Sequence, residues 1–275
     1  MLRQRVITAV LLFLAVVGVL ALGGADAWAL LMLPVMVLAI VEWLRLLQRA
    51  PWLPLLGALA GAAAYWWLRA GVGAPPGWLA PVMALGLLAW LLMACASVFR
   101  VQPLGTNPWL PAVSMLALWI SLYELRIAGA SVLLSAMALV WLADIGAYFT
   151  GRAFGRRKLA PRVSPGKSWE GVWGGIALCI VTALVFRGAA GSLPDDFVVF
   201  STVLAQHTGG PVMGLVLAAV VLLSVLGDLY ESLLKRHAGV KDSGRCLPGH
   251  GGMFDRIDGL IPAMPLCLLI WMSLA

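Results

Sequence analysis

Residues 212–234 read VMGLVLAAVVLLSVLGDLYESLL, and the first sixteen of them contain no charged side chain. A helix crosses the hydrocarbon core of a bilayer with roughly 20 apolar residues. The stretch therefore predicts a transmembrane helix, with Asp228 and Glu231 near one of its ends. A carboxylate at that depth is costly and indicates a functional site by default. The structural alternative is a salt bridge inside the protein, or an acid whose side chain reaches the interface.

The same pattern recurs along the chain. It predicts nine transmembrane helices, at 5–23, 27–44, 53–70, 77–98, 108–123, 128–149, 170–188, 212–234 and 259–275. The composition agrees, because 62% of the residues are hydrophobic and only 11% are charged, against about 25% charged in soluble proteins. The runs are continuous rather than alternating, which argues against a transmembrane β-barrel. We expect an all-α, polytopic integral membrane protein that forms a single domain over residues 1–275.

The distribution of charge divides this domain into two parts. Residues 1–127 have few charges within the predicted helices and are expected to be a hydrophobic scaffold, or the walls of a groove for lipid. In this part, Glu42 near a helix end and Glu124 in a short turn are expected to be solvated at the membrane interface. Residues 128–275 contain most of the acids and the long basic loops, and should hold the functional site.

The first predicted helix has an alternative interpretation. Arg3 and Arg5, the apolar run after them and the triplet Ala25-Asp26-Ala27 resemble a signal peptide with its cleavage site. The run is long for a signal peptide, and eight more predicted helices follow it. We therefore expect it to be retained as a transmembrane helix.

The lysines and arginines predict the orientation in the membrane. If the N-terminus faces the cytoplasm, sixteen of the nineteen cations fall on that side, and only Arg69, Arg126 and Arg187 fall on the other. The positive-inside rule then favours a cytoplasmic N-terminus and an external C-terminus. The net charge of +7 is thus explained by topology, and no nucleic-acid partner is expected. The four cysteines include no CxxC pair, so they predict neither a zinc site nor a disulfide framework.

Six acids are expected at about the same depth in the membrane, near the cytoplasmic ends of the helices predicted in residues 128–275. They are Asp144, Glu170, Asp228, Glu231, Asp255 and Asp258. Two pairs, Asp228 with Glu231 and Asp255 with Asp258, are three residues apart, so each pair shares a helix face. Carboxylates without thiolates favour a hard cation such as Mg²⁺, which is usually bound by one or two acids and by substrate phosphates.

A basic loop at 152–168 ends in Ser164-Pro165-Gly166-Lys167-Ser168, which resembles the end of a phosphate-binding loop. A full Walker A motif would need glycine where this chain has Pro161, and no preceding strand is evident, so we reject that motif. Ser164, Lys167 and Ser168 still lead into a predicted helix, whose N-terminus could bind phosphate. The alternative is a polybasic loop attracted to anionic lipid headgroups.

Residues 232–258 read SLLKRHAGVKDSGRCLPGHGGMFDRID. This stretch resembles the signature of the phosphatidate cytidylyltransferase (CDP-diacylglycerol synthase) family over 27 residues without a gap. The segments around Asp144, around Gly227-Asp228 and at 164–168 are similar to further motifs of that family. The resemblance covers about the C-terminal half, while the N-terminal half agrees in hydropathy alone.

The resemblance implies a function and a set of partners. Such an enzyme lies in the cytoplasmic (inner) membrane of a bacterium, with its active site facing the cytoplasm, and makes CDP-diacylglycerol and pyrophosphate from CTP and phosphatidic acid. Its partners would be these two substrates and membrane lipid, with Mg²⁺ as cofactor. The resemblance does not decide whether a second cation binds or whether the enzyme forms a homo-oligomer.

The resemblance also implies roles for individual residues. Asp228 and Asp255 are the first candidates for metal ligands, followed by Asp144, Glu231 and Asp258. Nucleotide and phosphate contacts are expected from Ser164, Lys167, Ser168, Lys235, Arg236, Gly251 and Gly252. Catalytic roles are expected for Lys241, Asp242, His250 and Arg256.

Three other functions are compatible with part of the pattern. A transporter or channel should place its acids near the middle of the bilayer and often shows internal repeats, neither of which the sequence indicates. A CTP-using lipid kinase would share the charge pattern but should lack the 232–258 signature. A CDP-alcohol phosphatidyltransferase would need its own paired acidic motif, which this sequence lacks.

Overall fold

The computed structural model describes residues 14–194, 196–246 and 251–274, and nearly all of its regular structure is helical. A helical stretch at 14–22 leads to α2 (Ala25–Leu46), α3 (Trp52–Val72), α4 (Leu79–Arg100) and α5 (Trp109–Ala128). The second half contains α6 (Ala130–Phe154), α7 (Trp169–Ala189), the 3-10 turn η1 (Ala190–Ser192), α8 (Phe200–Thr208), α9 (Gly210–His237), α10 (Phe254–Ile257) and α11 (Leu260–Leu274).

Seven of the nine predicted membrane spans correspond to helices that could cross a bilayer. Within the described residues, seven helices are long and apolar enough to cross a bilayer. The protein is therefore an all-α, polytopic membrane protein. The 21-residue helix α3 is not among the seven, and the first predicted span, 5–23, lies largely outside the described residues.

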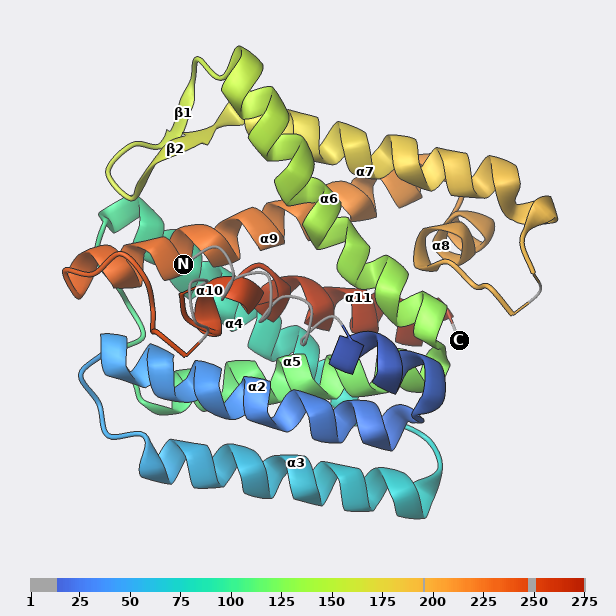
Figure 1. The fold of residues 1–275 in the computed structure, drawn as a ribbon, viewed down its shortest axis with the longest axis horizontal. Helices are drawn as coiled ribbons and strands as arrows, with labels where there is room; N and C mark the ends of the chain where they lie inside the picture. Colours follow the sequence, from blue (N-terminus) through green and yellow to red (C-terminus); the bar gives the residue numbers. More distant parts are fainter. Residues whose placement is uncertain (1–13, 195, 247–250, 275) are drawn as a thin grey trace.

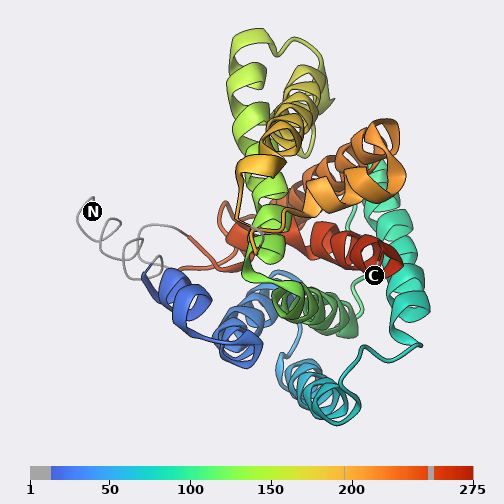
Figure 2. The ribbon, with the colours of Figure 1, turned by 90° about the vertical axis from the view of Figure 1, so that its right-hand side faces the viewer.

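Helix α11 occupies the centre of the bundle and packs against α4, α5, α6, α8 and α9 (Figure 1). Its Ala263, Met264 and Cys267 are fully buried. The end-on view shows α11 surrounded by these helices, whereas α6 and α7 form a pair that projects from the rest (Figure 2). The last helix is thus a core element that fixes the positions of the helices around it.

Two predicted loops contain regular structure. Residues 150–169 were expected to be loop, but α6 continues to Phe154, and β1 (Lys158–Ala160) and β2 (Ser164–Ser168) then form an antiparallel hairpin. The long connection at 189–211 contains α8, whose Phe200 and Leu204 are buried against neighbouring helices. The hairpin packs against α7 and α9, and α8 packs against α6, α7 and α9.

Glu124 corrects a prediction about the first half of the chain. It lies within α5 rather than in a turn, and it is only 5% exposed. Arg69 of α3 donates to its Oε1 at 2.8 Å, as does the Tyr65 hydroxyl at 2.8 Å. A buried carboxylate with a cationic partner is a structural feature of the scaffold, and removal of one partner would strand the other.

The hairpin, α10 and the C-terminal end of α9 lie at the same end of the molecule, opposite the C-terminus (Figure 1). Glu42 and the end of α2 are there as well, since Glu42 contacts residues of the 243–254 segment. The elements that were expected at one membrane face are therefore gathered at one end of the bundle.

Candidate active site

Three carboxylates converge where α9 meets the start of the last helical segment. Asp228 and Glu231 lie one turn apart on α9, and Asp258 directly follows α10. One oxygen from each of the three lies within 4.8 Å of the others. Gly227 makes this approach possible, because a Cβ there would collide with the backbone carbonyl of Asp258.

Two lysines bring positive charge to these acids. Lys167, in β2, places Nζ 2.6 Å from Asp228 Oδ2. Lys235 lies one turn beyond Glu231 on α9, and its Nζ is 2.6 Å from Glu231 Oε2 and 2.8 Å from Asp255 Oδ1. The hairpin and α9 thus each deliver one ammonium group to the same cluster.

Asp255 lies next to this group rather than within it. Its Oδ1 accepts the bond from Lys235, and its Oδ2 accepts the backbone N–H groups of Ser243 at 3.0 Å and Gly252 at 2.9 Å. Gly251 has φ +88°, a left-handed conformation that favours glycine, and it lets the chain turn around this carboxylate. The acid therefore holds the backbone of Ser243 and Gly252 and positions Lys235.

The donor set fits a hard divalent cation. Asp144 of α6 is within electrostatic range of both Lys167 and Asp228, so the two lysines face an excess of carboxylates. Oxygens of one octahedral Mg²⁺ shell, at 2.0–2.1 Å from the ion, lie about 3–4 Å apart, and the three acids approach that spacing.

The hairpin presents the predicted phosphate-binding residues differently. Lys167 points to the acids, whereas the buried Ser168 caps α7 by accepting the Gly171 N–H at 3.2 Å. Ser164 is half-buried at the start of β2. Glu170, in the first turn of α7, accepts the backbone N–H groups of Arg156 and Arg157, which fixes the hairpin to the helix.

Most of the remaining predicted residues that the structure describes have exposed side chains. Arg236, Lys241, Asp242 and Arg256 are exposed, and Gly252 is buried beside Ser243. His250 lies outside the described residues.

Glu42 was expected to be solvated, and this expectation is wrong. It is 3% exposed, and its Oε2 accepts the Ser243 hydroxyl at 3.0 Å and the Phe254 N–H at 2.9 Å. The next residue, Trp43, stacks on the Phe254 ring with centroids 4.8 Å apart. An acid from the first half of the chain is therefore hydrogen-bonded to Ser243, which itself binds Asp255, and to Phe254.

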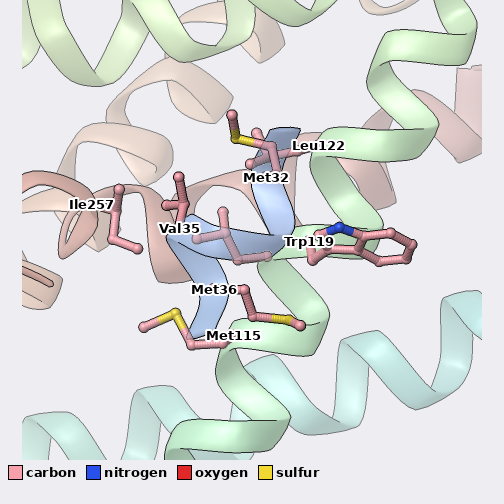
Figure 3. Close-up of a pocket in the computed structure, with 8 residues that line it drawn as sticks. Met32, Val35, Met36, Met115, Trp119, Leu122 and Ile257 are labelled. Carbon is pink, nitrogen blue, oxygen red and sulfur yellow. The ribbon is translucent and has the colours of Figure 1, made fainter. Parts of the chain in front are cut away.

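Two apolar cavities lie among the scaffold helices. One, of about 260 Å³, lies between α2, α3 and α5, with Asp26 and Trp66 among its lining residues. Asp26 is sixteen residues from Glu42 on α2, or about 24 Å along the axis, so this cavity is remote from the acids. The other, of about 10 Å³, is lined by apolar residues that include Met32, Met36, Met115 and Ile257 (Figure 3). It is too small for a substrate.

Comparison with known proteins gives a consistent result over the whole chain. Residues 3–274 match the model of the cytidylyltransferase family. A phosphatidate cytidylyltransferase of Pseudomonas aeruginosa is 39% identical over 98% of this chain and 97% of its own length. The enzyme of the same name from Haemophilus influenzae is 51% identical over 50% of this chain and 44% of its own length. The one from Thermotoga maritima is 42% identical over 52% of this chain and 50% of its own length.

Proposed function

This chain belongs to the cytidylyltransferase family, and from that premise we propose how its carboxylate cluster supports the reaction. The protein is a phosphatidate cytidylyltransferase, which transfers CMP from CTP to phosphatidic acid and releases pyrophosphate. The observation that supports the site assignment is the convergence of Asp228, Glu231 and Asp258, with Lys167 and Lys235 attached to the same group.

The chemistry requires little covalent help from the protein. A phosphomonoester has a second pKa near 6, so the lipid phosphate is largely dianionic at pH 7 and is already a nucleophile. One of its oxygens attacks the α-phosphorus of CTP, and the bond from that phosphorus to the bridging oxygen of the β-phosphate breaks. The difficulty lies in bringing two polyanions together in line, which is a matter of positioning and charge.

We assign Mg²⁺ to the cluster of Asp228, Glu231 and Asp258, with Asp144 at its edge. When bound, the ion would neutralise charge on the phosphates and align them. Asp255 was, with Asp228, a first candidate for a metal ligand. It contacts the cluster through Lys235, and we propose that it positions the Lys235 ammonium group.

The basic groups then bind the phosphates. We propose that Lys167 exchanges Asp228 for a CTP phosphate, with Ser164 beside it, and that Lys235 does the same from the other side. Arg236, Lys241 and Arg256, whose side chains are exposed, hold phosphate of the nucleotide or the lipid, and Asp242 orients Lys241.

The glycines and the histidine of the signature contribute in other ways. Gly251 and Gly252 allow the backbone to approach the substrate phosphates closely, and His250 donates a hydrogen bond to a phosphate. Ser168 contributes by capping α7, since its hydroxyl already accepts the Gly171 N–H.

The orientation follows from the same proposal. We infer nine membrane crossings, with the N-terminus and the acidic cluster on the cytoplasmic side of the inner membrane and the C-terminus outside. This arrangement is supported by the sixteen-to-three distribution of cations and by the common location of the hairpin, α10 and the end of α9. CTP and pyrophosphate would then exchange directly with the cytoplasm, while the lipid enters sideways from the bilayer.

The activity is tested with CTP labelled separately at the α- and γ-phosphates. Purified protein is incubated with phosphatidic acid and Mg²⁺, and the lipid phase is extracted. We expect label from α-labelled CTP in the lipid and γ label only in released pyrophosphate. Transfer of the γ label to lipid would indicate a kinase, and the absence of both labels from the lipid would contradict the assigned reaction.

A further inference from the structure

We propose that Glu42, from the first half of the chain, is a positioning residue of the active site, which acts through Ser243 on Asp255 and Lys235. The proposal rests on the function proposed above, because it concerns the same site. It assigns a positioning role in catalysis to a residue that lies outside the 232–258 signature, 190 residues before its first member, Ser232.

The first step is the contact between the two halves of the chain. Glu42 Oε2 accepts the Ser243 hydroxyl at 3.0 Å, and it also accepts the Phe254 backbone N–H at 2.9 Å. A single carboxylate oxygen thus bonds to both Ser243 and Phe254. Hydrogen bonds to a charged acceptor are roughly twice as strong as neutral ones, so these two bonds hold Ser243 and Phe254 firmly in place.

The second step leads from Ser243 to the acids. The Ser243 hydroxyl accepts the Asp255 N–H at 3.3 Å, and the Ser243 N–H donates to Asp255 Oδ2 at 3.0 Å. Asp255 Oδ1 in turn holds Lys235, whose Nζ also contacts Glu231 of the three-acid cluster. An unbroken series of hydrogen bonds and ion pairs therefore connects Glu42 to the proposed metal site.

The packing around Glu42 shows how closely the loop is fitted to it. A Cβ at Gly244 would collide with the Glu42 carboxylate, and one at Gly252 would lie 2.5 Å from its Oε2. Trp43 packs on the other side, stacked on Phe254 and edge-on to Tyr230 of α9, with centroids 5.8 Å apart. The end of α2 thus packs closely against Gly244, Gly252 and Phe254.

A purely structural role would be expected to affect stability alone, and Glu124 provides the matched control. It is another buried acid of the first half, 5% exposed, but its partners Arg69 and Tyr65 belong to the scaffold. Glu124→Gln should lower thermal stability in detergent while the folded protein keeps the turnover of the unmodified enzyme.

The test compares Glu42→Ala, Glu42→Gln, Ser243→Ala and the double variant Glu42→Ala/Ser243→Ala in the purified full-length chain. Groups that orient catalytic ligands typically contribute about 10–100-fold, so we expect Glu42→Ala to lower kcat by about that factor with little change in the KM for CTP. Glu42→Gln keeps one acceptor oxygen and should recover part of the loss. Because Glu42 acts through Ser243, the double variant should lose little more than the single variant.

Two results would overturn the proposal: kcat unchanged in Glu42→Ala, or losses that multiply independently in the double variant. Hydrogen exchange of the 243–246 and 251–255 amides gives a readout that does not depend on the reaction. We expect faster exchange there in Glu42→Ala than in Glu124→Gln. If the unmodified protein makes no CDP-diacylglycerol, the proposed function fails, and equal exchange in the two variants would then still refute the positioning role.

Discussion

Lys167 and Arg157 are two basic residues of one short segment with very different surroundings. Lys167 Nζ lies 2.6 Å from Asp228, whereas the Arg157 side chain is exposed and its backbone N–H binds Glu170. If Lys167 binds the CTP phosphates, Lys167→Ala should lower kcat/KM by about 100-fold or more, as for loss of a donor to developing charge. Arg157→Ala should lower kcat/KM by about fivefold at most, because one cation near an anionic surface contributes about 1 kcal/mol.

Steady-state kinetics with CTP as the varied substrate measure this difference. Equal small losses in the two variants, with unchanged KM for CTP, would show that the segment binds only lipid headgroups.

Asp255 provides a second prediction at the level of single residues. Asp255→Asn keeps the size of the side chain but weakens its hold on Lys235 and on the Ser243 and Gly252 N–H groups. We expect turnover to fall by at least about 10–100-fold, as for other groups that orient ligands, and added Mg²⁺ should not restore it. Recovery at high Mg²⁺ in a titration of the initial rate would make Asp255 a metal ligand instead.

The residues of the site differ in how far the sequence reveals them. Asp228, Glu231 and Asp258 could be predicted, because an acid near the end of an apolar helix is costly and short spacings place such acids on one face. Glu42 could not, because its partner Ser243 lies 201 residues away and nothing local distinguishes it from a solvated acid at a helix end. A buried position for Glu42 follows only from the tertiary packing of α2 against the 243–254 segment.

The packing of α6 against α7 depends on small residues. A Cβ at Gly175 would lie 2.7 Å from the Ala143 carbonyl, and one at Gly146 would lie 2.8 Å from the Gly174 carbonyl. Close helix contact of this kind is typical of membrane proteins, where small residues let backbones approach. The contact places Asp144 of α6 near Lys167, which lies two residues before α7 begins.

Gly175→Val should therefore separate the two helices. We expect the midpoint of thermal unfolding in detergent to fall by about 2–10 °C, as for overpacking in a core, and turnover to fall with it. Gly86→Ala is the control, since Gly86 of α4 has no neighbouring atom within 4 Å of an added Cβ. An unchanged midpoint in Gly175→Val would contradict the close contact.

The elements were predicted with uneven success for physical reasons. Continuous apolar runs identify long helices directly, and the eight predicted spans after the first correspond to α2–α7, α9 and α11. The β1–β2 hairpin was missed because Ser164-Pro165-Gly166 has low strand propensity and pairs only through its contact with Lys158–Ala160. Helix α8 was missed because nine residues are too few for a clear helical period.

The whole molecule makes a topological prediction. Reporter fusions placed after Lys158 and after Lys241 should report the cytoplasm, and a fusion after Asp196 should report the opposite side. The physical reason is that cations are retained on the cytoplasmic side during insertion. A periplasmic signal from the Lys241 fusion would separate the site from CTP and would refute the proposed location.

The central claim is that the cluster of Asp228, Glu231 and Asp258 holds the Mg²⁺ that cytidylyl transfer requires. The most direct test is the Mg²⁺ dependence of CDP-diacylglycerol formation by Asp228→Asn, with Asp196→Asn on an exposed connection as the control. We predict that Asp228→Asn inserts and purifies normally, turns over at least about 100-fold more slowly because it lacks a ligand, and recovers partly at high Mg²⁺. The control should match the unmodified enzyme, and an Asp228→Asn variant with the same rate and Mg²⁺ dependence would contradict the claim.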